Sequence, residues 1–246
     1  MASATRPPVD AGASGVAPQR SDRSPWNWLL LVPIVVVLLV PLYNHVDPTF
    51  GSWPLFYWLQ LAFVAHTNAD RAPDHGVNAA LAAVLGLRDA VPLEPADGDP
   101  RAGLGRVGEL DRAMPLREFA ALAARVLPAT VGGVRAAGDP ERIVRRVAVC
   151  GGSGGSLTGA AAAAGADVFL TSDLKHHPVS ESLESTGPAL CDVGHFATEW
   201  PWLPVAADVL HRDLSGRVEV AVSRRRTDPW TWHEGSNGVP AGRSAG

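Results

Sequence analysis

The stretch LCDVGHFATEW, residues 190–200, decides how the fold of this chain is interpreted. It begins as a short apolar run, breaks at Gly194 and then presents His195 and Glu199. If a strand ends at Gly194 and a helix follows, His195 and Glu199 lie four residues apart on one helix face. An imidazole and a carboxylate placed in this way can share a cation, since both are common ligands of Zn, Fe, Mn and Ni. A surface His–Glu pair, in which the helix dipole favours Glu199, is the alternative interpretation.

The composition of the chain limits the classes of protein to which it can belong. Its 246 residues are enough for one large domain or two small ones. The net charge is −4, so there is no broad basic character and we expect no nucleic-acid partner. Cys150 and Cys191 are the only 2 cysteines, and each lies beside an apolar, strand-like run. Two cysteines cannot form a disulfide framework, so we expect buried, reduced thiols.

The N-terminal region changes character abruptly. Residues 1–24 are rich in Ala, Pro, Ser and Gly and have almost no bulky apolar side chains, so we expect them to be disordered. Residues 26–43, WNWLLLVPIVVVLLVPLY, carry no charge and have about the length that crosses a hydrocarbon core of ~30 Å. Aromatic residues at both ends of this run are typical of a membrane interface. A core helix of a soluble domain is the alternative.

A second apolar run, residues 53–65, is only about two-thirds of a spanning length. Arg20 and Arg23 precede the first run, which predicts a cytoplasmic N-terminus. One span would place the rest of the chain outside, whereas a hairpin of two helices would keep it inside. We favour the hairpin, and therefore expect a membrane protein whose C-terminal domain is cytoplasmic.

From residue 63 onwards, strand patterns alternate with helix patterns, which predicts an α/β sandwich. Helices are expected over residues 77–87 and 115–127, where apolar residues recur at helical spacing. Residues 66–70 are expected to form the loop after the first strand. Strands are expected over residues 63–65, 104–109, 131–136, 145–150, 167–171, 189–193 and 217–223.

A turn rich in glycine and serine, GGSGGS at residues 151–156, lies between a predicted strand and an alanine-rich helix. Such a turn can bind an anion at the helix N-terminus. No Lys-Ser or Lys-Thr pair follows it, and no acidic residue is placed to bind a ribose, so it is neither a P-loop nor a dinucleotide fingerprint. A tight strand-to-helix turn is therefore favoured over phosphate binding.

Four short motifs follow one another along the chain: HTNAD at 66–70, GLGRVG at 103–108, TSDLKHH at 171–177 and GHFATE at 194–199. In this order they resemble the Nif3-like dinuclear metal-centre family, whose members are also called GTP cyclohydrolase 1 type 2 homologues. The resemblance runs from about residue 63 to about residue 233 and implies a Nif3-like α/β sandwich. It also implies a divalent metal ion (Zn, Fe, Mn or Ni, not distinguished), metal-assisted hydrolysis and, as in the family, a homo-oligomer.

The resemblance also implies roles for particular residues. The metal ligands would be Asp70, His195 and Glu199. The residues that line the pocket would be His66, Lys175, His176 and His177. The cationic and hydrogen-bond-donor character of the last three would suit a small anionic substrate, and a basic surface cluster is the alternative for them.

The chain departs from the family pattern at its N-terminal side. The portion of the family that carries a His-His-Pro pair of metal ligands is missing, and residues 176–178 occur in a different motif. We therefore expect a truncated domain with an incomplete metal site that holds at most one ion. Residues 25–62 instead resemble the DUF3311 type of small membrane protein.

The expected domain organisation has four parts: a disordered tail (1–24), a membrane segment (25–62), an incomplete Nif3-like domain (63–233) and a second disordered tail (234–246). The expected function is that of a metal-dependent hydrolase. A non-catalytic membrane protein and a non-functional gene fusion are the alternatives.

Overall fold

A computed structural model describes residues 49–50, 53–54, 66–214 and 217–235 of the chain. The chain divides into two compact units, residues 1–58 and residues 59–246. In the first unit, strands β1 (Thr49–Phe50) and β2 (Trp53–Pro54) pair antiparallel. The predicted span at residues 26–43 lies outside the described residues.

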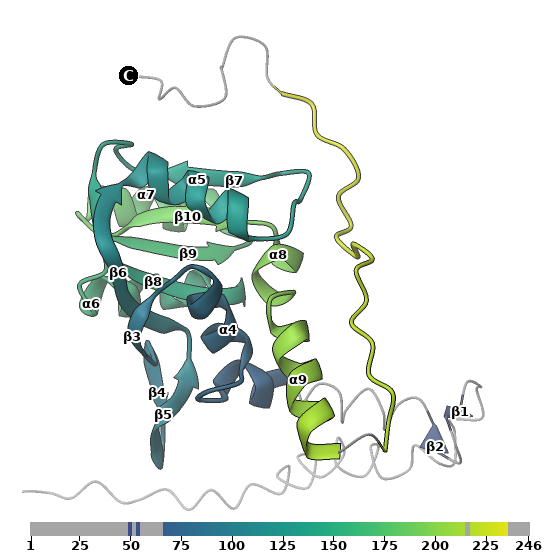
Figure 1. The fold of residues 1–246 in the computed structure, drawn as a ribbon. Coiled ribbons are helices and arrows are strands. Elements are labelled where there is room, and N and C mark those ends of the chain that lie inside the picture. Colours follow the sequence, from purple (N-terminus) through teal and green to yellow (C-terminus); the bar gives the residue numbers. More distant parts are fainter. Residues whose placement is uncertain (1–48, 51–52, 55–65, 215–216, 236–246) are drawn as a thin grey trace, which may run out of the picture. The chain divides into compact units, whose positions relative to one another are not determined.

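A six-stranded mixed sheet forms the centre of the second unit (Figure 1). Three neighbouring strands in the middle of it run parallel, and the remaining neighbours pair antiparallel. The parallel strand β9 is buried at every position, as expected for a strand covered on both faces. In spatial order the strands are β3 (Arg88–Val91), β6 (Arg106–Pro115), β8 (Ile143–Ser153), β9 (Val168–Ser172), β10 (Ala189–Val193) and β7 (Val134–Ala137).

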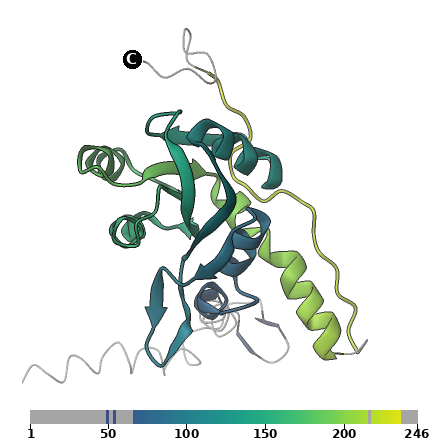
Figure 2. The ribbon, with the colours of Figure 1, turned by 60° about the vertical axis from the view of Figure 1, so that its left-hand side comes forward.

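Helices cover both faces of this sheet, which confirms the predicted α/β class (Figure 1; Figure 2). One face is covered by α4 (Val77–Val84) and α5 (Leu116–Val126). The other face is covered by the short 3-10 turn η2 (Gly155–Leu157), α6 (Thr158–Ala163) and α7 (His176–Glu184). Two further helices, α8 (His195–Glu199) and α9 (Trp202–Leu214), follow β10.

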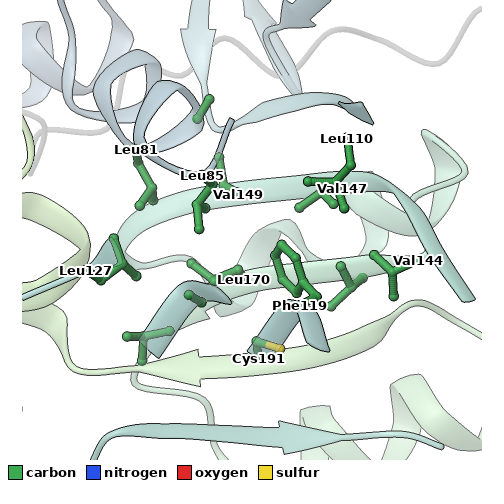
Figure 3. Packing of buried hydrophobic residues seen from close by; sticks show 14 of the residues in the cluster. Leu81, Leu85, Leu110, Phe119, Leu127, Val144, Val147, Val149, Leu170 and Cys191 are labelled. Atoms are coloured by element: carbon green, nitrogen blue, oxygen red, sulfur yellow. The ribbon is translucent and has the colours of Figure 1, made fainter. Parts of the chain in front are cut away.

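Neighbouring residues of β9 pack on opposite faces of the sheet, because side chains alternate along a strand. Leu170 packs with Leu81 of α4 and Phe119 of α5 in one hydrophobic cluster (Figure 3). Phe169 packs in a second cluster, with Ala161 of α6. This alternation lets helices pack against apolar side chains on both faces of the sheet.

The strands predicted over 145–150, 167–171 and 189–193 are confirmed as parts of β8, β9 and β10. The helices predicted over 77–87 and 115–127 are confirmed as α4 and α5, with slightly shorter bounds. Two predictions of local structure are wrong. Residues 66–71 are helical where a loop was expected, and residues 217–223 do not form a strand. A strand requires a hydrogen-bonded neighbour, and within the described residues none of the strands pairs with this segment.

A separate two-stranded sheet joins β4 (Glu94–Ala96) and β5 (Asp99–Leu104). It precedes β6, and the turn between β5 and β6 contains Gly105 at a φ of +60°. A side chain would be strained in this left-handed conformation, so the glycine allows the chain to pass from β5 into the main sheet.

The predicted location, a membrane protein with a cytoplasmic metal-binding domain, is wrong. Crossing a hydrocarbon core takes about 20 consecutive, mostly apolar residues in a helix. Across the part of the chain that the structure describes, none of the helices combines that length with that apolar character.

Candidate functional site

The carboxyl ends of three neighbouring parallel strands meet at one edge of the sheet. Gly152 lies near the end of β8, Asp173 directly follows β9, and His195 follows β10 after one residue. Ligand sites of α/β sheets lie at this edge, so it is the natural place for chemistry. The structure brings two of these residues together, with His195 Nδ1 at 2.6 Å from Asp173 Oδ2.

The helix α8 presents His195 and Glu199 on one face, as the spacing predicted. Glu199 Oε1 lies 3.1 Å from His195 Nε2. The buried Thr198 fixes this helix to the sheet, because its hydroxyl donates to the His195 carbonyl at 2.8 Å and accepts from the Gly152 N–H at 2.9 Å. The side chains of His195 and Glu199 are therefore carried by a well-anchored backbone.

The helical turn at residues 66–71 brings His66 and Asp70 to the same place, although these residues lie far from Glu199 in the sequence. His66 Nδ1 is 3.2 Å from Asp70 Oδ2 in an i,i+4 pair. His66 Nε2 is 3.7 Å from Glu199 Oε1. Two imidazoles and two carboxylates from the first and last of the four motifs thus form one group, which we call the His66–Glu199 cluster (His66, Asp70, His195 and Glu199).

A buried asparagine holds the turn that carries Asp70 against the sheet. The Asn78 side-chain amide donates to the Asp70 carbonyl at 2.9 Å, and its oxygen accepts from the Gly151 N–H at 2.8 Å. Asn78 is 1% exposed, so both hydrogen bonds are shielded from water and losing either one would leave a buried polar group without a partner.

A buried arginine fixes the segment that follows Asp70. Arg106, 2% exposed, donates to the carbonyls of Ala72 and Pro73 at 2.7 and 3.1 Å. It also donates to the carbonyls of Gly103 and Gly105 at 2.9 and 2.7 Å. Burial lowers the pKa of the guanidinium, and the charge of Asp74 opposes that effect. The GLGRVG motif includes Arg106, but the sequence did not predict that Arg106 binds the segment after Asp70, because the carbonyls of Ala72 and Pro73 lie far from it in the chain.

The side chains of His195 and Glu199 lie directly against the backbone of Gly152. Its φ is +67°, and a Cβ added there would lie 2.8 Å from Glu199 Oε1 and 3.3 Å from His195 Nε2. Glycine is therefore required both by the left-handed conformation and by the close approach of the two side chains. The first glycines of GGSGGS belong to β8 and support the cluster, and the tight turn that we favoured follows them at residues 154–157.

The environment perturbs two titratable members of the cluster. Burial raises the pKa of Asp70, an effect that His66 opposes and the nearby Glu199 charge reinforces. Burial disfavours the imidazolium of His195, but the hydrogen bond to Asp173 and the charge of Glu199 outweigh it and raise the pKa of His195. Burial, with smaller effects from Asp70 and Glu199, raises the pKa of the Cys150 thiol to about 12. Cys150 therefore lies close enough to the cluster to sense its charges.

The donor set of the cluster suits a divalent ion, since imidazole nitrogens and carboxylate oxygens bind Zn, Fe, Mn and Ni. Two atoms bonded to one ion at about 2.0–2.2 Å lie roughly 3.0–3.6 Å apart, and the cluster's contacts of 3.1, 3.2 and 3.7 Å are similar. These contacts form a chain of pairs. As the side chains stand, the described part of the molecule holds no group of three or more His, Cys, Asp or Glu placed to hold an ion together.

The three residues predicted to line a pocket for an anion lie beside this edge. Lys175 is the N-cap of α7, and His176 and His177 are its first residues. All three are exposed, and the two imidazole rings stack edge to face with centroids 5.4 Å apart. Among the described residues, no hydrogen bond or ion pair joins them to the His66–Glu199 cluster, so their role stays a prediction.

Comparison with known protein families gives one match along most of the second unit. The family model "Duf34/NIF3 (NGG1p interacting factor 3)" matches residues 61–229. This match begins after the first predicted span, residues 26–43, and the resemblance of residues 25–62 to the DUF3311 type is not supported.

Individual relatives agree with this match. The chain is 54% identical over 179 residues to a GTP cyclohydrolase 1 type 2 homolog of Streptomyces coelicolor, covering 70% of this chain and 62% of the relative. It is 47% identical over 142 residues to a protein of the same name from Mycobacterium leprae, covering 58% of this chain and 36% of the relative. The chain thus spans less than two-thirds of the length of these relatives.

Two solved structures share the fold. The Bacillus cereus protein related to NIF3 superposes with a TM-score of 0.62 at 19% identity, covering 81% of this chain and 86% of that one. Staphylococcus aureus protein SA1388 superposes with a TM-score of 0.60 at 26% identity, covering 68% and 67% of the two chains. Both likenesses agree with the mixed α/β fold around a central sheet.

Proposed function

Because the chain belongs to the Duf34/NIF3 family, we propose that it binds one divalent metal ion in the His66–Glu199 cluster and acts as a metal-dependent hydrolase. One observation carries the proposal. Two motifs far apart in the sequence bring two imidazoles and two carboxylates into a chain of contacts of 3.1 to 3.7 Å, and Gly152 leaves room for His195 and Glu199. A structural role alone would not need four ionisable side chains in contact with one another, two of them directly above a glycine.

The proposed ligands are Asp70, His195 and Glu199, with His66 lining the site and near enough to supply a fourth donor. Protein sites for such ions use three or four side chains, so this set serves one ion. Two ions would repel each other, and the cluster offers only two carboxylates to offset that repulsion. Since the donors form pairs rather than one convergent group, we expect weak binding.

The residues around the ion would have distinct tasks in hydrolysis. A bound divalent ion lowers the pKa of a coordinated water and polarises the group to be attacked. Arg106 and Asn78 hold the Asp70 turn in place, and Thr198 holds α8. Lys175, at the edge of the site with His176 and His177, would attract a small anionic substrate.

Elemental analysis of the purified full chain tests the metal proposal. We expect at most one equivalent of metal in the wild type, and much less in Asp70→Ala and Glu199→Ala. Glu181→Ala, which removes an exposed carboxylate of α7, is the charge-matched control and should keep its metal. Two tightly held equivalents would refute the single-ion site. Unchanged metal content in both cluster variants would remove these residues from it.

GTP is the first substrate to test, because the relatives at 54% and 47% identity are both named GTP cyclohydrolase 1 type 2 homolog. We expect metal-loaded protein to consume GTP, followed by chromatography, and Glu199→Ala to lose this activity. Lys175→Ala should raise KM more than it lowers kcat, since it would contact the anion and not the reacting atoms. If GTP is stable, other small phosphorylated compounds become the substrates to screen.

The alternatives, a non-catalytic membrane protein and a non-functional fusion, are not favoured, because the family match covers residues 61–229 and the cluster is built from both ends of it. Assembly into a homo-oligomer stays a prediction.

A further inference from the structure

His195 lies between two carboxylates, one on each ring nitrogen. Asp173 Oδ2 is 2.6 Å from Nδ1, and Glu199 Oε1 is 3.1 Å from Nε2. A neutral imidazole carries one proton, so only one of these contacts can then be an N–H···O hydrogen bond. The carboxylate that holds this proton determines which nitrogen keeps a free lone pair.

The contact with Asp173 is the shorter one, and short distances mark the stronger charge-assisted hydrogen bonds. It follows from the register of the sheet, in which Asp192 of β10 pairs with Thr171 of β9. The residues after the two strands are therefore neighbours. Asp173 also has a φ of +58°, an uncommon conformation for a residue other than glycine, at the point where the chain leaves β9.

We propose that Asp173 is a positioning residue that holds the proton of His195 on Nδ1 and so presents the Nε2 lone pair to the metal ion. The inference rests on the metal site proposed above. Ligating histidines of metalloproteins commonly donate their second ring N–H to a carboxylate in this way, which fixes both the tautomer and the ring orientation. Nothing in the sequence pattern alone pairs residue 173 with residue 195.

Loss of Asp173 has a specific consequence because of Glu199. With one carboxylate gone, Glu199 becomes the only carboxylate bonded to the ring, and the proton moves to Nε2. That is the nitrogen an ion would need, so the wrong tautomer opposes metal binding while the ligands themselves are unchanged. Removing such a partner typically lowers metal affinity by about 10- to 100-fold.

The tautomer can be measured on the metal-free full chain by long-range ¹H–¹⁵N correlation of ¹⁵N-histidine-labelled protein. The pH is raised until His195 is neutral, and its signals are assigned with His195→Gln. In the wild type we expect the proton on Nδ1. In Asp173→Asn, which keeps the size of the side chain, and in Asp173→Gly, which suits the left-handed backbone, we expect it mainly on Nε2. Glu181→Gln, the charge-matched control on α7, should match the wild type.

Titration with zinc chloride by calorimetry completes the test. We expect Asp173→Asn and Asp173→Gly to bind zinc 10- to 100-fold more weakly than the wild type and Glu181→Gln. An Nδ1 proton that persists in both Asp173 variants, or zinc affinity within twofold of the wild type, would overturn the inference. If the wild type itself binds no zinc, the proposed function fails. The tautomer measurement then still shows whether Asp173 keeps the proton of His195 on Nδ1.

Discussion

Replacing Gly152 by alanine tests whether the absence of a side chain at this position of β8 is what leaves space for His195 and Glu199 in the candidate site. Two effects act at this position. Alanine in the left-handed region costs about 1–2 kcal/mol of stability, and Gly152 has a φ of +67°. In addition, the new Cβ would lie 2.8 Å from Glu199 Oε1 and 3.3 Å from His195 Nε2, both closer than ordinary contacts.

The two effects should fall on different properties of the protein. The Glu199 carboxylate is the far end of a flexible side chain and is 31% exposed, so it can swing into solvent at little cost to the fold. The free energy of unfolding should therefore fall only by the backbone term, about 1–2 kcal/mol. Metal affinity should fall by more than tenfold, because the displaced carboxylate is a proposed ligand.

Gly165→Ala is a matched control for Gly152→Ala. Gly165 has a φ of +69°, nearly the same as that of Gly152, but a Cβ there would meet no atom within 4 Å. Urea denaturation should show a similar loss of stability in the two variants, and zinc titration should show weakened binding only in Gly152→Ala. Equal zinc affinity in the two variants would refute the idea that Gly152 supports the site.

Three further predictions concern the rest of the domain. Burial raises the pKa of both thiols, Cys150 and Cys191, to about 12. Only about 1 thiol in 10⁴ is then ionised at pH 8. A disulfide reagent such as DTNB should therefore react with neither cysteine in the native chain and with both cysteines after denaturation. Rapid labelling of the native chain would contradict this prediction. Arg106→Lys should lower the free energy of unfolding by about 3 kcal/mol in urea denaturation, since one ammonium cannot bond all four carbonyls that Arg106 binds. A loss below about 1 kcal/mol would show that these hydrogen bonds contribute little to stability. Burial, partly offset by Arg135, raises the pKa of Asp192 above the ordinary value of 3.8. The contribution of Asp192 to stability is therefore greatest below pH 3.8 and declines as the pH rises through the folded-state pKa. The difference in stability between the wild type and Asp192→Asn should therefore shrink or reverse on going from about pH 3.5 to pH 7, and a difference that grows with pH would contradict the direction of the shift.

Local patterns were enough to predict much of this domain from its sequence. The His195–Glu199 pair lies on one helix face because both residues belong to the same short helix, and an i,i+4 spacing needs no tertiary information. The central strands could be found because strands buried on both faces are continuously apolar. One sequence-based error arose where a local pattern lacked its partner. Residues 217–223 alternate like a strand, yet in the described chain they have no neighbouring strand to complete their hydrogen bonds.

The sequence by itself determined the residue types, the α/β class and the pairing of His195 with Glu199. Only the tertiary structure decided that His66, paired with Asp70, meets Glu199, that Asp173 binds His195 and that Gly152 lies beneath His195 and Glu199. These contacts join segments far apart in the chain, and they depend on which strands are neighbours and in what register. Strand order and register are set by the packing of both faces of the sheet at once, so no single stretch of sequence contains them.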